Sequence, residues 1–186
     1  MDVELSTEDR RALCAVAREA IEARLFHRTA APARVKGVTM RVGAFVTLRE
    51  NGQLRGCIGR MRSETPLYET ISEMALAAAF EDPRFDPVSR VEIEDIDIEI
   101  TVLGPLRKIA KAEDLAVGRH GLYIFAKGRT GVLLPQVATE YGWNGFEFLD
   151  QVCFKAGLPP GTWKERETEL FVFEGIVFGE KELRQV

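Results

Sequence analysis

The sequence of 186 residues has few cysteines and few histidines, and this scarcity excludes several kinds of site. Its three cysteines, Cys14, Cys57 and Cys153, are scattered and odd in number, which is typical of reduced thiols rather than of a disulfide framework. His27 and His120 are the only histidines, and no CxxC or HxxxH pair is present to organise a metal. This spacing nearly excludes a structural zinc site, and we expect no metal ion and no cofactor in this chain.

Long hydrophobic runs and a strong net charge are also missing. The chain is 46% hydrophobic and 29% charged, with a formal charge of −4. No run is long enough to cross a bilayer, so we expect no membrane association. The mild acidity argues against general nucleic-acid binding, which needs a concentrated basic face, although a local patch is not excluded. The start, MDVELSTEDRR, lacks the cationic-then-apolar order of a secretory signal, which favours a cytoplasmic protein.

A helix is predicted over residues 6–27. Ser6 or Thr7 can cap it, and apolar residues recur at helical spacing after the cap. These residues are Leu13, Val16, Ala17, Ala20 and Ile21. Residues 29–37 have no periodicity and indicate a connecting loop.

A hairpin, a helix and a strand are predicted next. The dipeptide Asn51-Gly52 lies between two β-prone runs and is the strongest short-range hairpin signal, which predicts strands near 43–50 and 53–59. A helix follows with Thr65 as its cap and Pro66 in its first turn. The stretch IDIEITVLG then alternates apolar and polar residues, as a strand with one solvated side does.

The second half of the chain repeats this order. It has a hairpin turning near residues 128–131, a helix over 136–141, a further helix capped by Asn144 and closed by Gly157, and a last strand in ELFVFEGIVFGE. We therefore predict an α+β fold in one domain spanning 1–186, because hairpins dominate and no βαβ alternation occurs. The N-terminal helix would precede two similar hairpin-helix-strand half-units, roughly 38–105 and 118–180, which share a mostly antiparallel sheet.

The stretch NGQLRGCIGR carries the candidate site. A two-residue turn places Leu48 opposite Arg55 and Val46 opposite Cys57, so that Arg55 and Cys57 share an otherwise apolar face. Burial there would raise the pKa of the Cys57 thiol, whereas the charge of Arg55 would lower it. A register slip of one residue would change these neighbours.

Each residue of this stretch has a functional and a structural interpretation. Cys57 is either a catalytic nucleophile, with His120 as the only plausible histidine base, or a packed core thiol, which is the more common role. Gly56 and Gly59 either admit a ligand to the backbone or allow another element to pack closely.

Charged residues outside the stretch leave similar alternatives. Arg84, in DPRF, either ties loop carbonyls together or lines a cleft. Asp97 and Glu99 are more typical of a solvated strand face than of an acid/base pair.

Several motifs together resemble the AMMECR-like domain family, named after the human protein of the Alport, midface hypoplasia and elliptocytosis chromosomal region. They are LRGCIG, PLYETISEMALAAAFEDPRF, IEITVLGP, GLYIF, GVLLPQVATEYGW, FLDQVCFKAGLPPGTW and ELFVFEGIVFGE. They run in order over about residues 8–180, and LRGCIG is the family hallmark. The sequence departs from the family at Arg60, where a small hydroxyl residue is expected, and at His120, where an acidic residue is expected.

The resemblance implies a fold and a set of partners rather than an established activity. It implies the duplicated α+β fold, with the hallmark strand near a cleft between the halves. Prokaryotic members of this length are similar to AmmeMemoRadiSam system protein A, which accompanies a Memo-like protein and a radical SAM protein. Iron and S-adenosylmethionine would then belong to those partners.

Three hypotheses about function follow. The leading one is an accessory or binding module with a groove between the halves at the LRGCIG strand, in which Arg55, Gly56, Gly59 and Arg84 bind a protein segment or a small anionic ligand. In that case Arg55→Ala should abolish binding and leave stability nearly unchanged. The alternatives are an enzyme with Cys57 as nucleophile, and a purely structural role for LRGCIG.

Overall fold

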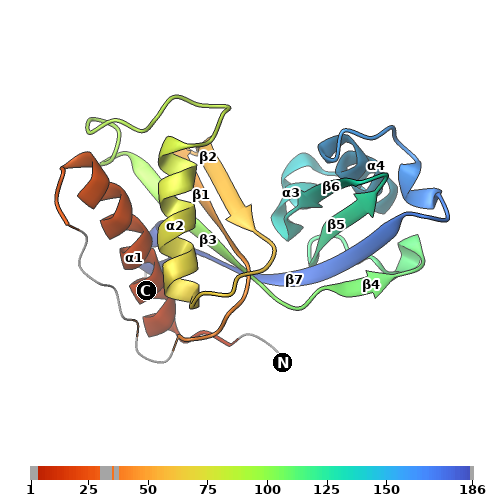
Figure 1. Ribbon diagram of the computed structural model, residues 1–186, viewed down its shortest axis with the longest axis horizontal. Helices are drawn as coiled ribbons and strands as arrows, with labels where there is room; N and C mark the ends of the chain where they lie inside the picture. The colour runs from red at the N-terminus through yellow and green to blue at the C-terminus, as the bar shows by residue number, and fades with distance from the viewer. Residues whose placement is uncertain (1–3, 30–34, 36–37, 185–186) are drawn as a thin grey trace. The chain divides into compact units, whose positions relative to one another are not determined.

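The structure is a computed structural model that describes residues 4–29, 35 and 38–184. Most of the loop expected over 29–37 lies outside these residues. The described residues form two compact units, a larger one with those of 4–103 and 176–184 and a smaller one of residues 104–175 (Figure 1). Both combine helices with antiparallel strands, which confirms the α+β class.

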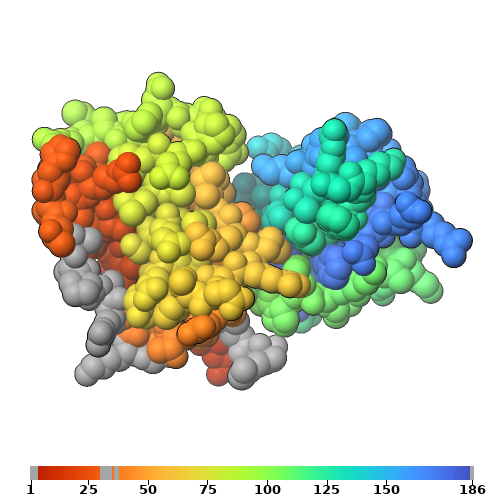
Figure 2. Space-filling view, in the orientation of Figure 1, coloured from red at the N-terminus to blue at the C-terminus, as the bar shows by residue number. Residues whose placement is uncertain are grey.

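In the larger unit, two helices cover one face of an antiparallel sheet (Figure 1). Its elements are α1 (Thr7–Leu25), β1 (Ala44–Glu50), β2 (Gln53–Arg60), α2 (Leu67–Phe80), β3 (Ile96–Leu103), the end of β7 (Glu169–Gly179) and α5 (Glu180–Arg184). The strands follow the order β2-β1-β3-β7, so β2 is the terminal strand. On the surface, α2 lies beside the β1-β2 hairpin (Figure 2).

Local sequence signals explain where most of these elements begin. Ser6, one of the two predicted cap residues, caps α1, and the structure adds a capping box with Asp9. Asn51 and Gly52 both have positive φ, 51° and 81°, as the predicted turn requires. The predicted cap at Thr65 is wrong, because α2 begins at Leu67 and its cap position is Pro66, without a side-chain cap. The Thr65 hydroxyl lies 3.1 Å from that of Thr70 instead.

The alternation in β3 sets the core of the larger unit. Ile96, Ile98, Ile100 and Val102 are buried in the cluster that α1 and α2 cover. The opposite face is less solvated than predicted: Asp97 and Glu99 are half-buried, and Thr101 is 1% exposed.

In the smaller unit, a hairpin and two helices surround a second core cluster. Its elements are β4 (Arg107–Ile109), the 3₁₀ turns Ala112–Asp114 and Thr162–Lys164, β5 (His120–Ala126), β6 (Arg129–Leu133), α3 (Pro135–Tyr141), α4 (Gly145–Lys155) and the first part of β7. Asn144 caps α4 through a capping box, as predicted. The sequence did not indicate β4 or α5, which have three and five residues.

The order hairpin, helix, strand therefore occurs in both units. The compact units differ from the half-units 38–105 and 118–180, because the end of β7 and α5 belong to the larger unit. An origin of the two parts by duplication stays a prediction.

Candidate functional site

The register of the β1-β2 hairpin differs from the predicted one. Thr47, not Val46, lies opposite Cys57, and Leu48 lies opposite Gly56. Because the core residues Val46 and Leu48 face the helices, Cys57 and Thr47 lie on the opposite face of the sheet. The apolar surroundings predicted for Cys57 are therefore wrong.

A β-bulge at Arg55 causes this change. Leu54 pairs with Arg49 and Gly56 pairs with Leu48, so Arg55 is the extra residue on β2. The bulge interrupts the alternation of side chains, and the shared face predicted for Arg55 and Cys57 no longer follows from spacing. An alternating pattern carries no signal for an inserted residue, which is why the sequence did not reveal it.

The hairpin of the smaller unit has no such insertion. There the pairs from Ala126 with Arg129 to Leu122 with Leu133 run without a shift. In both hairpins a glycine of the second strand contacts the helix that packs on it: a Cβ at Gly56 would lie 2.2 Å from the Ala78 carbonyl oxygen, and one at Gly131 would lie 2.6 Å from that of Val152. The first hairpin therefore has one more residue, Arg55, between its turn and the glycine that contacts the helix than an unshifted register would have.

Packing accounts for both glycines of the hallmark stretch. Gly56 allows α2 to lie directly on β2, and at Gly59 a Cβ would lie 2.2 Å from the ring of Phe45, its cross-strand partner. A ligand-binding role for Gly56 and Gly59 stays a prediction.

Asp82 is the centre of a polar cluster at the outer edge of β2. Its carboxylate accepts hydrogen bonds from the Cys57 amide at 2.9 Å, and from Arg84 Nε and Nη2 at 2.9 and 2.7 Å. Arg84 Nη2 also donates to the Cys57 carbonyl at 3.2 Å. The Arg84 side chain is 45% exposed, whereas that of Asp82 is 2% exposed. The hydrogen bonds from Arg84 lower the pKa of Asp82 to about 2, and burial opposes this shift.

Arg55 forms an ion pair with Glu92 and not with Asp82. Its Nε donates to Glu92 Oε1 at 2.8 Å, and its side chain is 13% exposed. The Arg55 hydrogen bond is the main cause that lowers the pKa of Glu92 to about 2, and the Ser89 amide adds a second bond at 2.7 Å. The guanidinium groups of Arg55 and Arg84 lie 5.9 and 5.5 Å from the ring centre of Phe85. Arg55 thus anchors the loop after α2, so the expectation that Arg55→Ala leaves stability unchanged does not agree with the structure.

A row of polar side chains crosses the sheet beside this cluster. Thr47 of β1 lies directly between Cys57 of β2 and Glu99 of β3, and its hydroxyl donates to Cys57 Sγ at 3.3 Å. A thiol, a hydroxyl and a carboxylate therefore share one face. The sequence interpretation missed Thr47 and Asp82. A polar residue between the buried Val46 and Leu48 was the available signal for Thr47.

His120 belongs to the smaller unit and has a local structural role. It is 7% exposed, and its Nδ1 accepts the Ala116 amide at 3.0 Å. Burial is the main cause that lowers the pKa of His120. The nitrogen Nδ1 is thus occupied by a turn of its own unit, which weakens the case for His120 as a catalytic base.

Among the described residues, no helix has both the length and the apolar character of a membrane span. In the same part of the chain, no group of three or more His, Cys, Asp or Glu side chains is arranged to hold a metal ion.

Several known proteins are similar to this chain in sequence, and one solved structure is also similar in fold. A protein of Methanothermobacter thermautotrophicus is 41% identical over 185 residues, covering 95% of this chain and 96% of the relative. A protein of Aeropyrum pernix is 40% identical over 97% of this chain and 83% of its own length. The crystal structure of an uncharacterized protein from Pyrococcus horikoshii matches with a TM-score of 0.87 and 35% identity, over 92% of this chain and 91% of that one.

None of these relatives carries a name that states an activity. The sequence model of the AMMECR1 family matches residues 14–178, which is most of the chain and includes the whole LRGCIG stretch. The chain therefore belongs to the AMMECR1 family, whose members matched here are uncharacterised proteins.

Proposed function

We propose that the protein is an accessory or binding module whose ligand contacts Arg84 at the edge of β2 and the sheet face that carries the half-buried Cys57 and Glu99. One observation carries the proposal: the Arg84 guanidinium is held in place by the buried Asp82 carboxylate and is 45% exposed. A positioned, accessible guanidinium is suited to a carboxylate or phosphate group. The bulge at Arg55 adds support, because bulges are frequent beside functional sites.

The backbone at Cys57 favours binding over acyl-transfer catalysis. Its amide donates to Asp82 and its carbonyl accepts from Arg84. A nucleophilic thiol needs amide groups aimed at the developing oxyanion, and the Cys57 amide is already used by a carboxylate. The ligand would be a small anion or an acidic segment of a protein.

Binding to Arg84 is tested with substitutions on β2 and on the loop that follows α2. The tagged protein is used to capture ligands from lysate, and captured proteins and small molecules are identified by mass spectrometry. Arg84→Ala should reduce the affinity of the purified ligand at least about tenfold, the loss expected for one charge-assisted hydrogen bond. Arg60→Ala is the matched control, since Arg60 also lies at β2, is 40% exposed and pairs with Glu73 at 2.7 Å.

Thermal unfolding of each variant shows whether it is folded before its affinity is measured. Arg84→Lys keeps the charge but loses the planar fork, and it should lie between wild type and Arg84→Ala. Wild-type affinity in a folded Arg84→Ala variant would reject Arg84 as the contact.

The second candidate is an enzyme with Cys57 as nucleophile. The hydrogen bond from Thr47 to Cys57 Sγ and the proximity of Arg84 favour it, because both features stabilise a thiolate. Alkylation by iodoacetamide from about pH 6 to about pH 10, mapped to Cys57 by mass spectrometry, decides whether Cys57 is a nucleophile or a packed thiol. Rapid reaction well below about pH 8 supports catalysis, and a thiol that reacts only after unfolding supports packing.

The cellular setting is proposed from the family resemblance. We propose a cytoplasmic protein that acts beside Memo-like and radical SAM proteins in a modification pathway. Co-purification of a Memo-like protein with the tagged domain, reduced by Arg84→Ala and not by Arg60→Ala, would support this setting. Capture of unrelated proteins alone would argue against it.

A further inference from the structure

A second candidate site lies on the larger unit, where α1 and α5 meet. A cavity of about 410 Å³ is lined by both helices, and its volume is in the range of small-molecule sites. The α1 residues Arg11, Cys14, Arg18 and Glu22 recur at three- or four-residue steps, so they form one stripe of the helix. The residues of α5 close the opposite side.

Three of the residues that line the cavity, Cys14, Ala15 and Leu183, are uncharged and largely apolar. Cys14 is 4% exposed, and burial, the largest cause, raises the pKa of its thiol to about 12. The thiol therefore remains neutral at physiological pH and presents a weakly polar surface to a ligand.

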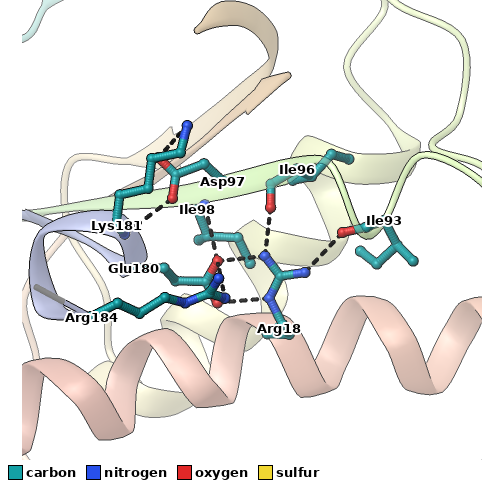
Figure 3. A network of polar contacts seen from close by, with 8 residues as sticks. All are labelled: Arg18, Ile93, Ile96, Asp97, Ile98, Glu180, Lys181 and Arg184. Atoms are coloured by element: carbon teal, nitrogen blue, oxygen red, sulfur yellow. Dashed lines mark hydrogen bonds and ion pairs between the residues drawn. The ribbon is translucent and has the colours of Figure 1, made fainter. Parts of the chain in front are cut away.

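The carboxylates that line the cavity already have arginine partners. Arg18 donates to both carboxylate oxygens of Glu180 through Nε and Nη2. Its Nη1 donates to the Ile93 carbonyl at 3.0 Å, and its Nη2 also donates to the Ile96 carbonyl at 2.6 Å (Figure 3). Glu19 and Glu22 are bonded by Arg28 at 2.5 and 3.1 Å.

Within the described part of the chain, two arginines of the cavity have most of their N–H groups without a hydrogen-bond partner. Arg11 donates through Nη2 to the Leu183 carbonyl at 3.3 Å, and Arg184 Nη2 lies 4.0 Å from Glu180, beyond hydrogen-bond distance (Figure 3). Each guanidinium has five N–H groups. The cavity therefore offers the N–H groups of two charged guanidinium groups, Arg11 and Arg184, beside three uncharged side chains.

We propose that this cavity binds a small amphipathic carboxylate. The apolar body of the ligand lies against Cys14, Ala15 and Leu183, and its acidic head accepts hydrogen bonds from Arg11 and Arg184. The site does not include Arg84 or Cys57. Its ligand would contact α1 and α5 at the same time.

Three probes of equal length separate charge recognition from apolar binding. The ¹⁵N-labelled protein is titrated with hexanoate, 1-hexanol and hexylammonium, and amide shifts are followed by NMR. Hexanoate should shift amides of α1 and α5 saturably, and should bind at least about tenfold more tightly than hexanol, as a charge-assisted hydrogen bond implies. Hexylammonium should bind least.

Variants then locate the head group. Arg11→Ala combined with Arg184→Ala should weaken hexanoate about tenfold or more and leave hexanol unchanged, whereas Arg60→Ala should change neither. Both arginines are exposed, so the double variant should remain folded. Absence of saturable hexanoate binding, equal binding of the three probes, unchanged affinity in the double variant, or shifts centred on Cys57 would each overturn the proposal.

Discussion

The substitution Asp82→Asn tests the polar cluster at the edge of β2. The side chain of Asp82 is 2% exposed, and its pKa falls from an ordinary value of 3.8 to about 2. One pKa unit corresponds to about 1.4 kcal/mol, so the charged carboxylate stabilises the fold by about 2 kcal/mol at neutral pH. Asparagine lacks the charge and one acceptor oxygen, so Asp82→Asn should lower the unfolding free energy by about this amount.

The pH dependence separates this electrostatic effect from a packing effect. A lowered pKa in the folded state means that the stabilisation is complete above the unfolded pKa and is lost as pH falls through the folded one. The difference between wild type and variant should be constant above about pH 5 and should shrink between about pH 4 and about pH 2. The lowered pKa of Glu92 affects both proteins equally and cancels in the difference.

Urea unfolding followed by circular dichroism at several pH values measures this difference. Asp86→Asn is the control, since Asp86 is an exposed aspartate of the same loop and its substitution should change stability little. A difference that stays the same from neutral pH to about pH 2, or no difference at pH 7, would refute the role assigned to Asp82.

Three further substitutions test other contacts by the same unfolding assay. Gly56→Ala should cost about 1–3 kcal/mol, because its Cβ would overlap the Ala78 carbonyl oxygen of α2, and a neutral result would contradict the close helix-strand contact. Glu180→Gln leaves Arg18 without its carboxylate and should cost about 3 kcal/mol, whereas a loss below about 1 kcal/mol would show that the buried pair contributes little. Asn144→Ala removes the cap of α4 and should cost about 1 kcal/mol, and Asn144→Asp, which keeps the cap, serves as its control.

The sequence was sufficient for elements that depend on neighbouring residues. The capping boxes at Ser6 and Asn144, and the positive φ angles of Asn51 and Gly52, follow from side-chain and backbone chemistry within a few positions. The buried stripe of β3 follows from strict alternation. Short elements such as β4 and α5 carry too few residues to show a period.

The candidate site depended on contacts between distant segments. Arg55 and Cys57 were identified from the hairpin, but their partners Glu92 and Asp82 lie 37 and 25 positions away along the chain. Arg84 was identified from its loop and pairs with Asp82 two positions away, yet only the fold brings this pair to Cys57. The bulge at Arg55 moved Cys57 to the face of Thr47, because one inserted residue reverses the side of every residue after it.

By itself, the sequence determined the α+β class, the hairpin turn at Asn51 and Gly52, and the helix caps at Ser6 and Asn144. Tertiary structure alone decided which arginine is exposed and which is buried, since exposure depends on how the loop after α2 packs against β2. The sequence shows which side chains can carry a charge or donate a hydrogen bond. Which distant residue each of them contacts, as Arg55 contacts Glu92, depends on how the whole chain folds.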